Sequence, residues 1–287
     1  MRRRALLASL AATAVLPARA QSPLRLVAAE NFYGDIAGQL AGPDAVVTSV
    51  LSNPDQDPHL FEASPSVARA LSAARIVIAN GADYDPWMTK LLAAAKAPDR
   101  QVIMAAELAH RKAGDNPHLW YDTGVIATVA RAISAALSAA DAAHKADHAA
   151  RLQAFLDSLR PLDAKIAAMR ARFAGQAVTA TEPVFGYMAT ALGLAMRNER
   201  FQLAVMNDTE PRTSDVASFE ADLRQHRVRV LLYNSQATNP AAERLLGIAR
   251  TVHVPVVGIT ETLPAGKTYQ GWMTGQLEAL EAALAAS

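Results

Sequence analysis

The sequence contains no cysteine among its 287 residues, which excludes a disulfide scaffold, a thiolate metal site and a thiol nucleophile. Aromatic residues make up only 6% of the chain, too few to favour a stacking platform for bases or sugars. An excess of one charge is also lacking, since 28 Lys and Arg face 27 Asp and Glu. This balance argues against a nucleic-acid binder. The length suggests one large or two ordinary domains, and hydrophobic residues, at 51% of the chain, are numerous enough to build their cores.

The first twenty residues have the three parts of a secretory signal peptide. Arg2–Arg4 form the positive region, 5–16 the apolar region, and Ala18-Arg19-Ala20 the cleavage site. The apolar region is too short for a membrane-spanning anchor. Sec and twin-arginine export both remain open. We therefore expect a periplasmic protein without a lipid anchor, whose mature chain carries a net charge of −3.

Short apolar runs alternate with helical stretches along the mature chain, as in α/β proteins. Strands are predicted at 24–28, 46–51, 75–79 and 101–104, and again at 177–181, 228–234 and 254–259. A helical run of about thirty residues lies between the two series, with Pro161 inside it as an expected bend or joint. Such a helix spans about 45 Å, the length of a whole domain. We interpret it as a strut over 141–173 that joins an N-terminal α/β lobe, 24–140, to a C-terminal one, 174–287.

One short motif occurs twice. Asp57-Pro58-His59-Leu60-Phe61 recurs as Asn116-Pro117-His118-Leu119-Trp120. Proline restricts its own backbone and that of the preceding residue, and the aromatic residue can anchor the segment in the core. Each copy would present an imidazole from a rigid loop, as a preformed metal site requires. The alternative is that both histidines only cap or hydrogen-bond within loops.

Two glutamates follow predicted strands of the second series. Glu182 comes directly after 177–181, and Glu261 follows 254–259. Ligands of open α/β sheets bind beyond the carboxyl ends of the strands, so both carboxylates are placed to face a crevice. The alternative is that each one caps the next helix.

Two further groups are weaker candidates. His144 and His148 share one helix face by their spacing, but the polar, alanine-rich surroundings favour a solvated face. Asp208 and Glu210 lie in a predicted loop. The sequence is equally compatible with side chains that reach the crevice and with side chains that only form part of a turn.

The chain resembles the metal-binding solute-binding proteins of ABC transporters that import zinc, manganese or iron(II), over essentially its whole mature length. The segments that carry the resemblance are Ala29-Glu30-Asn31-Phe32-Tyr33-Gly34-Asp35, 53–59, 62–66, Asn80-Gly81, 116–120, 181–187 and Thr260-Glu261-Thr262. Each is weak alone, but their order along the chain is specific. No histidine-rich loop separates the two motif histidines, although many zinc importers have one.

The resemblance implies two lobes, each a mostly parallel sheet flanked by helices, joined by one long rigid helix with the metal between the lobes. It implies four metal ligands, which are His59, His118, Glu182 and Glu261. Glu261 departs from the usual Asp and has a longer reach. The resemblance further implies a periplasmic monomer that delivers the ion to an ABC permease and is not an enzyme.

The donor set is compatible with more than one divalent ion. Bidentate carboxylates would give up to six donors, which suits Mn²⁺, whereas four single donors would give tetrahedral Zn²⁺. Donor type favours manganese slightly, intrinsic affinity favours zinc, and Fe²⁺ is also compatible. Two other classes remain open: a carrier of an organic ligand such as a siderophore or haem, and a metal-dependent hydrolase. The hydrolase would need an open coordination position that four protein ligands do not leave.

The histidine assignment makes a direct prediction. His59→Ala and His118→Ala should each weaken divalent-metal binding strongly, because each removes one nitrogen donor from a site that holds one ion per chain. Titration of the metal-free protein with Zn²⁺ and Mn²⁺ measures the loss. Unchanged affinity in both variants would overturn the assignment.

Overall fold

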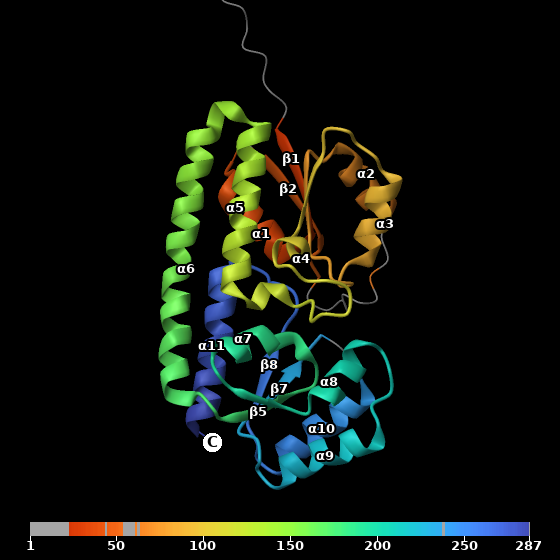
Figure 1. Cartoon of the computed structure of the whole chain (residues 1–287), viewed down its shortest axis with the longest axis vertical. Coiled ribbons are helices and arrows are strands. Elements are labelled where there is room, and N and C mark those ends of the chain that lie inside the picture. The colour runs from red at the N-terminus through yellow and green to blue at the C-terminus, as the bar shows by residue number, and fades with distance from the viewer. Residues whose placement is uncertain (1–22, 44, 54–60, 62–63, 237–238, 287) are drawn as a thin grey trace, which may run out of the picture.

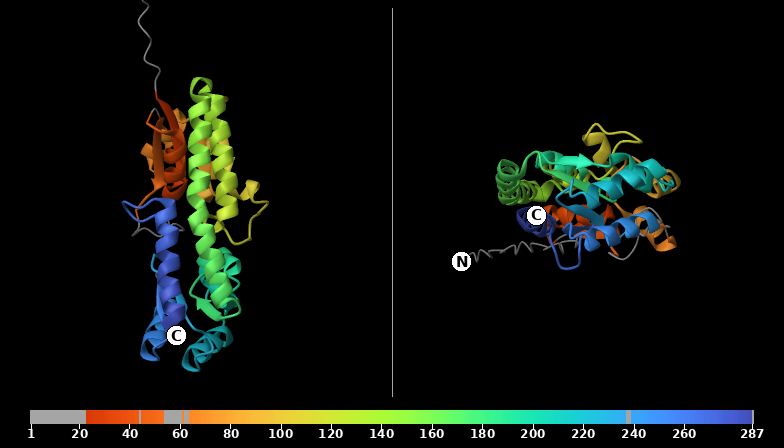
Figure 2. Two further views of the ribbon diagram at one scale, coloured as in Figure 1. Left: turned by 90° about the vertical axis from the view of Figure 1, so that its left-hand side faces the viewer. Right: turned by 90° about the horizontal axis from the view of Figure 1, so that it is seen from below.

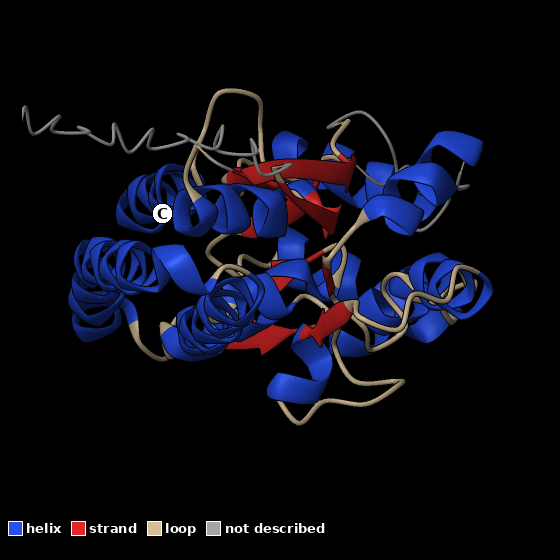
Figure 3. Ribbon diagram, turned by 90° about the horizontal axis from the view of Figure 1, so that it is seen from above, coloured by secondary structure: helices blue, strands red, loops and turns tan. Residues whose placement is uncertain are grey.

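The computed structural model describes residues 23–43, 45–53, 61, 64–236 and 239–286. The predicted signal peptide, 1–20, and His59 lie outside these residues. The described chain forms two α/β halves stacked along one long axis, with a long helix running beside both (Figure 1). Strands lie in the interior and helices enclose them (Figure 3). The predicted fold class is confirmed.

The first half is a parallel sheet in the order β2-β1-β3-β4. Its strands are β1 (Leu24–Glu30), β2 (Ala45–Leu51), β3 (Ile76–Ala79) and β4 (Gln101–Met104). Its helices are α1 (Asn31–Ala41), α2 (Pro65–Ala73), α3 (Pro86–Ala94), α4 (Ala105–Leu108) and the 3₁₀ helix η2 (Leu119–Tyr121). The central strands β1 and β3 are almost wholly buried, because helices cover both faces of a parallel sheet.

The second half repeats this topology in the order β6-β5-β7-β8, again parallel. Its strands are β5 (Ala177–Ala180), β6 (Ala195–Arg197), β7 (Leu231–Asn234) and β8 (Val256–Ile259). Its helices are η4 (Pro183–Phe185), α7 (Gly186–Ala191), α8 (Glu199–Met206), α9 (Thr213–Arg224), α10 (Pro240–Thr251) and α11 (Tyr269–Ala286). In both halves the strand order reverses between two central strands, the point at which open α/β sheets bind ligands.

The long helix α6 runs from Lys145 to Phe173 and continues through Pro161, so the predicted joint at this proline is absent. It begins after the 3₁₀ helix η3 (Ala142–His144) and lies side by side with α5 (Thr123–Ala140) (Figure 2). The predicted solvated histidine face is wrong for His148, which is 3% exposed and lies 3.4 Å from the carbonyl of Leu40.

One hydrophobic core runs through both halves. It includes Leu26 and Ile36 from the first half and Val178 and Leu232 from the second. The start of α11 joins the halves as well, since the amide of Tyr269 donates to the Asp35 carboxylate at 2.8 Å. The two halves are therefore packed as one body.

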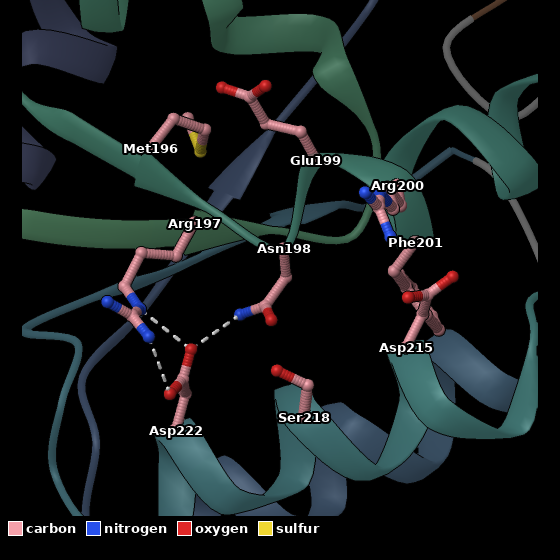
Figure 4. Close-up of a pocket in the computed structure, with 9 residues that line it drawn as sticks. All are labelled: Met196, Arg197, Asn198, Glu199, Arg200, Phe201, Asp215, Ser218 and Asp222. Carbon is pink, nitrogen blue, oxygen red and sulfur yellow. Dashed lines mark hydrogen bonds and ion pairs between the residues drawn. The ribbon is translucent and has the colours of Figure 1, made fainter.

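A cavity of about 430 Å³ opens between α8 and α9, away from the residues predicted to bind metal (Figure 4). The Asp222 carboxylate in its wall accepts two hydrogen bonds from Arg197, at 2.7 and 3.0 Å, and one from Asn198 at 3.1 Å. Burial raises the pKa of Asp222, but these bonds outweigh it and leave the pKa below its usual value. The cluster ties the edge strand β6 to α9.

Asp222→Asn should lower the free energy of unfolding by about 1.5–3 kcal/mol at neutral pH, because charge-assisted bonds to Arg197 are lost. A carboxyl with a lowered pKa in the folded state stabilises fully above its unfolded pKa, about 3.9. The difference from wild type should hold from pH 5 to 8 and shrink as the pH falls below about 4. Urea unfolding across this range measures it. Asp215→Asn in the same cavity is the control, and a difference independent of pH would contradict the assignment.

Candidate metal site

The second histidine motif, 116–120, forms a loop that hydrogen bonds and aromatic packing fix to the first half. Asn80, directly after β3, donates from its side-chain nitrogen to the carbonyl of Pro117 at 2.8 Å. Tyr33 in turn donates to the Asn80 side-chain oxygen at 2.8 Å. Trp120 is fully buried, with its ring centroid 4.9 Å from that of Tyr84. The expected aromatic anchor is therefore present, and it fixes the loop that carries the histidine.

The His118 side chain is fully buried at the boundary between the halves. The ring of Trp120 meets it edge-on at 5.2 Å between centroids, and that of Tyr84 does so at 5.9 Å. Its Nδ1 lies 2.6 Å from Oδ1 of Asn116. Its Nε2 lies 3.4 Å from the Oε2 of Glu261, a residue of the other half. The imidazole is thus oriented towards a carboxylate 143 positions later in the chain.

Three polar side chains follow strands of the second sheet and meet at its carboxyl edge. Glu182 follows β5, Asn234 ends β7 and Glu261 follows β8, and they are 4%, 3% and 0% exposed. The Asn234 side-chain nitrogen donates to Glu182 at 2.9 Å and to Glu261 at 2.6 Å. One amide therefore holds both carboxylates next to each other. This arrangement lies at the strand-order reversal of the second sheet.

The Glu261 segment is fixed through its backbone. The Gln236 side-chain oxygen accepts from the amides of Glu261 and Thr262, and its nitrogen donates to the Thr262 hydroxyl at 2.7 Å. Asn31 of the first half both donates to and accepts from the backbone of Leu263, at 2.7 and 2.8 Å. The position of Glu261 is therefore set by both halves.

Buried ionisable groups surround these residues. Burial, followed by the charges of Glu261 and Glu30, raises the pKa of Tyr84 well above its usual value, so that the phenol stays protonated. Burial and the neighbouring Asp85 likewise raise the pKa of Glu30. Asp85 accepts from the amides of Asn80 and Gly81 at 2.8 Å each. Burial also raises the pKa of Asp85, although these backbone bonds oppose the shift.

Pairwise contacts link three of the four predicted ligands: His118 lies beside Glu261, and Asn234 bonds to both Glu261 and Glu182. The capping alternative fails for Glu182, which occupies an N-cap position without a side-chain cap bond. In the described part of the chain no three His, Cys, Asp or Glu side chains are close enough to enclose a metal ion. The fourth predicted ligand, His59, is outside that part, although Phe61 of the same motif contacts Trp87 with centroids 4.5 Å apart. Asp208 and Glu210 are exposed.

Sequence reasoning missed Asn234, Gln236 and the role of Asn116. Asn234 had a usable signal, because it ends a strand that was predicted at 228–234, beside the strands that precede both glutamates. Gln236 had none, because its contacts are with backbone amides 25 and 26 residues away.

The chemistry of this donor set fits a divalent cation. An imidazole nitrogen and carboxylate oxygens are ligands of borderline to hard ions such as Zn²⁺ and Mn²⁺. Two carboxylates can balance the charge of one divalent ion, which lowers the cost of holding it away from water. The hydrogen bonds that Asn116 accepts from His118 and that Asn234 donates to the two glutamates are outer contacts of the kind that orient such ligands.

A comparison with protein families matches residues 26–283 to the family described as zinc-uptake complex component A, periplasmic. The chain belongs to this family. Members are metal-binding components of ABC uptake systems, so the chain is a solute-binding protein and not an enzyme. This agrees with the resemblance carried by the sequence motifs.

Individual relatives agree with this placement. The zinc-binding protein TroA of Treponema pallidum is 21% identical over 252 residues, covering 82% of this chain and 80% of TroA. The manganese-binding lipoprotein MntA of Halalkalibacterium halodurans is 24% identical over 144 residues, 49% of this chain and 47% of MntA. The solved structure of TroA superposes with a TM-score of 0.77 at 20% identity, covering 92% of this chain and 99% of TroA.

A Mn-bound periplasmic metal-binding protein of Candidatus Liberibacter asiaticus superposes with a TM-score of 0.74 at 16% identity. It covers 91% of this chain and 99% of its own. At these identities the structural likeness establishes the fold, and the residues themselves must support the site.

Asn234→Ala should destabilise the metal-free protein by about 2 kcal/mol or more, because two buried carboxylates lose their shared donor. Thermal unfolding in the presence of a chelator measures the change. Asn207→Ala is the control, since that exposed side chain donates only to a helix carbonyl, Leu203 O. Equal melting temperatures for the two variants would show that the carboxylates do not depend on Asn234.

Proposed function

We propose that the chain binds one divalent transition-metal ion, manganese or zinc, between its two halves and delivers it to the membrane permease of an ABC importer. It does so in the periplasm, as a monomer without a lipid anchor, after cleavage of the signal peptide 1–20. The observation that carries the proposal is the contact of His118 with Glu261. The two side chains come from different halves, are fully buried and lie 3.4 Å apart.

We assign four ligands, which are His59, His118, Glu182 and Glu261. Support for Glu182 comes from the amide of Asn234, which it shares with Glu261. Support for His59 comes from the repeated Pro-His motif. Each lobe then supplies two donors, with the lobes divided as 24–140 and 174–287 around a linking segment at 141–173.

The preference between metals depends on Glu182, the first of the two proposed ligands in the C-terminal lobe. Glu182 supplies hard oxygen donors, which favours Mn²⁺ slightly over Zn²⁺, and Fe²⁺ is compatible with the same donors. The relatives divide in the same way, because TroA is named for zinc and MntA for manganese. Intrinsic affinity still ranks zinc above manganese, so binding in vitro must be compared between metals in one protein.

Glu182→His should shift the preference towards Zn²⁺, because an imidazole supplies one nitrogen where a carboxylate can supply two oxygens. Loss of one hard donor is expected to move the Zn/Mn affinity ratio by about tenfold or more, equivalent to about 1.4 kcal/mol. Bound metal raises the melting temperature by mass action. Melting shifts with each metal therefore report the ratio.

The control is Glu199→His, the same exchange at an exposed position in the first turn of α8. Native mass spectrometry of the wild type gives the number of ions bound. A Mn²⁺ shift in Glu182→His as large as in wild type would remove Glu182 from the ligand set. Absence of any metal-bound species in the wild type would overturn the proposed function.

A further inference from the structure

Asn116 lies at the junction of the two halves and makes four hydrogen bonds with different tasks. Its side-chain nitrogen donates to the carbonyl of Pro183 at 2.8 Å. Its side-chain oxygen lies 3.1 Å from the amide of His118 and 2.6 Å from Nδ1 of the same residue. Its carbonyl accepts from the Tyr187 hydroxyl at 2.7 Å. One residue of the first half thus contacts both His118 and the segment that follows Glu182.

These bonds fix the orientation of the amide group. Only the nitrogen of Asn116 can donate to the Pro183 carbonyl, so the oxygen must be the atom that faces His118. That oxygen only accepts. The Nδ1 of His118 must therefore carry its proton, which leaves the lone pair of the neutral ring on Nε2, the atom that faces Glu261.

Both partners in the second half follow a candidate ligand, Glu182, in the chain. Pro183 directly follows Glu182, and Tyr187 lies one turn later in α7. Gly186 leaves room for the contact, because a Cβ atom there would lie only 2.8 Å from the Asn116 side-chain nitrogen. A side chain at 186 would therefore push Asn116 away from Pro183.

We propose that Asn116 is a positioning residue that selects the Nε2 lone pair of His118 for the metal and, through Pro183 and Tyr187, ties this histidine to the Glu182 segment of the other half. The inference rests on the proposed metal-binding function. Its consequence is that ion release requires the Asn116 contacts to break, because the two segments cannot separate while the contacts hold. Asn116 thereby controls the rate of release as well as the geometry of binding.

The two tasks are separable by substitution. Asn116→Asp keeps an acceptor for Nδ1 and loses the donor to Pro183. Tyr187→Phe removes the second link between the halves and leaves His118 untouched. Asn116→Ala removes both the acceptor for Nδ1 and the donor to Pro183, but keeps the backbone carbonyl that Tyr187 contacts. Thr190→Ala is the control on α7, since that exposed hydroxyl bonds only within its own helix, to Gly186 O.

The first measurement is nitrogen NMR of the histidine ring in metal-free protein at pH 8, which distinguishes Nδ1–H from Nε2–H. Wild type, Asn116→Asp, Tyr187→Phe and Thr190→Ala should show His118 with the proton on Nδ1, and Asn116→Ala should show the other form. Persistence of the Nδ1–H form in Asn116→Ala would overturn the orienting role. This measurement uses metal-free protein, so it tests the orienting role of Asn116 even if the protein does not bind metal.

The second measurement is the rate of metal dissociation into excess chelator. Tyr187→Phe should release the ion about 2–10-fold faster, as expected for the loss of one neutral hydrogen bond. Asn116→Asp should release it faster still, because its carboxylate faces the Pro183 carbonyl. Asn116→Ala should lose about 10–100-fold in affinity. Wild-type release rates in both Tyr187→Phe and Asn116→Asp would overturn the link between the halves.

Discussion

The central constraint on the structure is the burial of three ionisable side chains, His118, Glu182 and Glu261, at the junction of the two halves. Burying ionised groups is costly unless each is hydrogen-bonded or balanced by opposite charge. The chain meets this cost with Asn116 on the histidine and Asn234 on the two carboxylates, and with a proposed cation as the remaining partner. The surrounding elements support this arrangement, because the carboxyl end of the second sheet supplies the two glutamates, a loop of the first half supplies His118, and α6 and α11 pack against each other beside both halves.

The two halves contribute to the site in different ways. The first half supplies a stiff loop, with Trp120 packed beneath it and Asn80 bonded to its backbone. The second supplies two carboxylates, Glu182 after β5 and Glu261 after β8, which are aligned by the amide of Asn234 at the end of β7. In the proposed site, a rigid imidazole faces carboxylates that can each bind an ion through one or two oxygens.

Much of this architecture could be predicted from local sequence. The buried strand β3, predicted at 75–79, consists of consecutive apolar residues, and α10 begins at a strong cap, Asn239 followed by Pro240. The three-residue strand β6 and the helix α8 escaped prediction, because β6 is stabilised by pairing with β5 rather than by its own pattern. At the site, the histidine and glutamates could be predicted from repetition and strand ends. The roles of Asn234 and Gln236 could not, because they depend on contacts between segments that only the folded chain brings together.

The hydrophobic core that runs through both halves has a consequence for how such a protein can change over evolutionary time. Topology divides the molecule into two similar sheets, yet packing does not, since residues of both lie in one continuous apolar cluster. A half transplanted from a distant relative would expose the apolar surface that its own partner covers. The halves are therefore expected to evolve as a matched pair, and metal preference should change through single ligands at the junction rather than through exchange of modules.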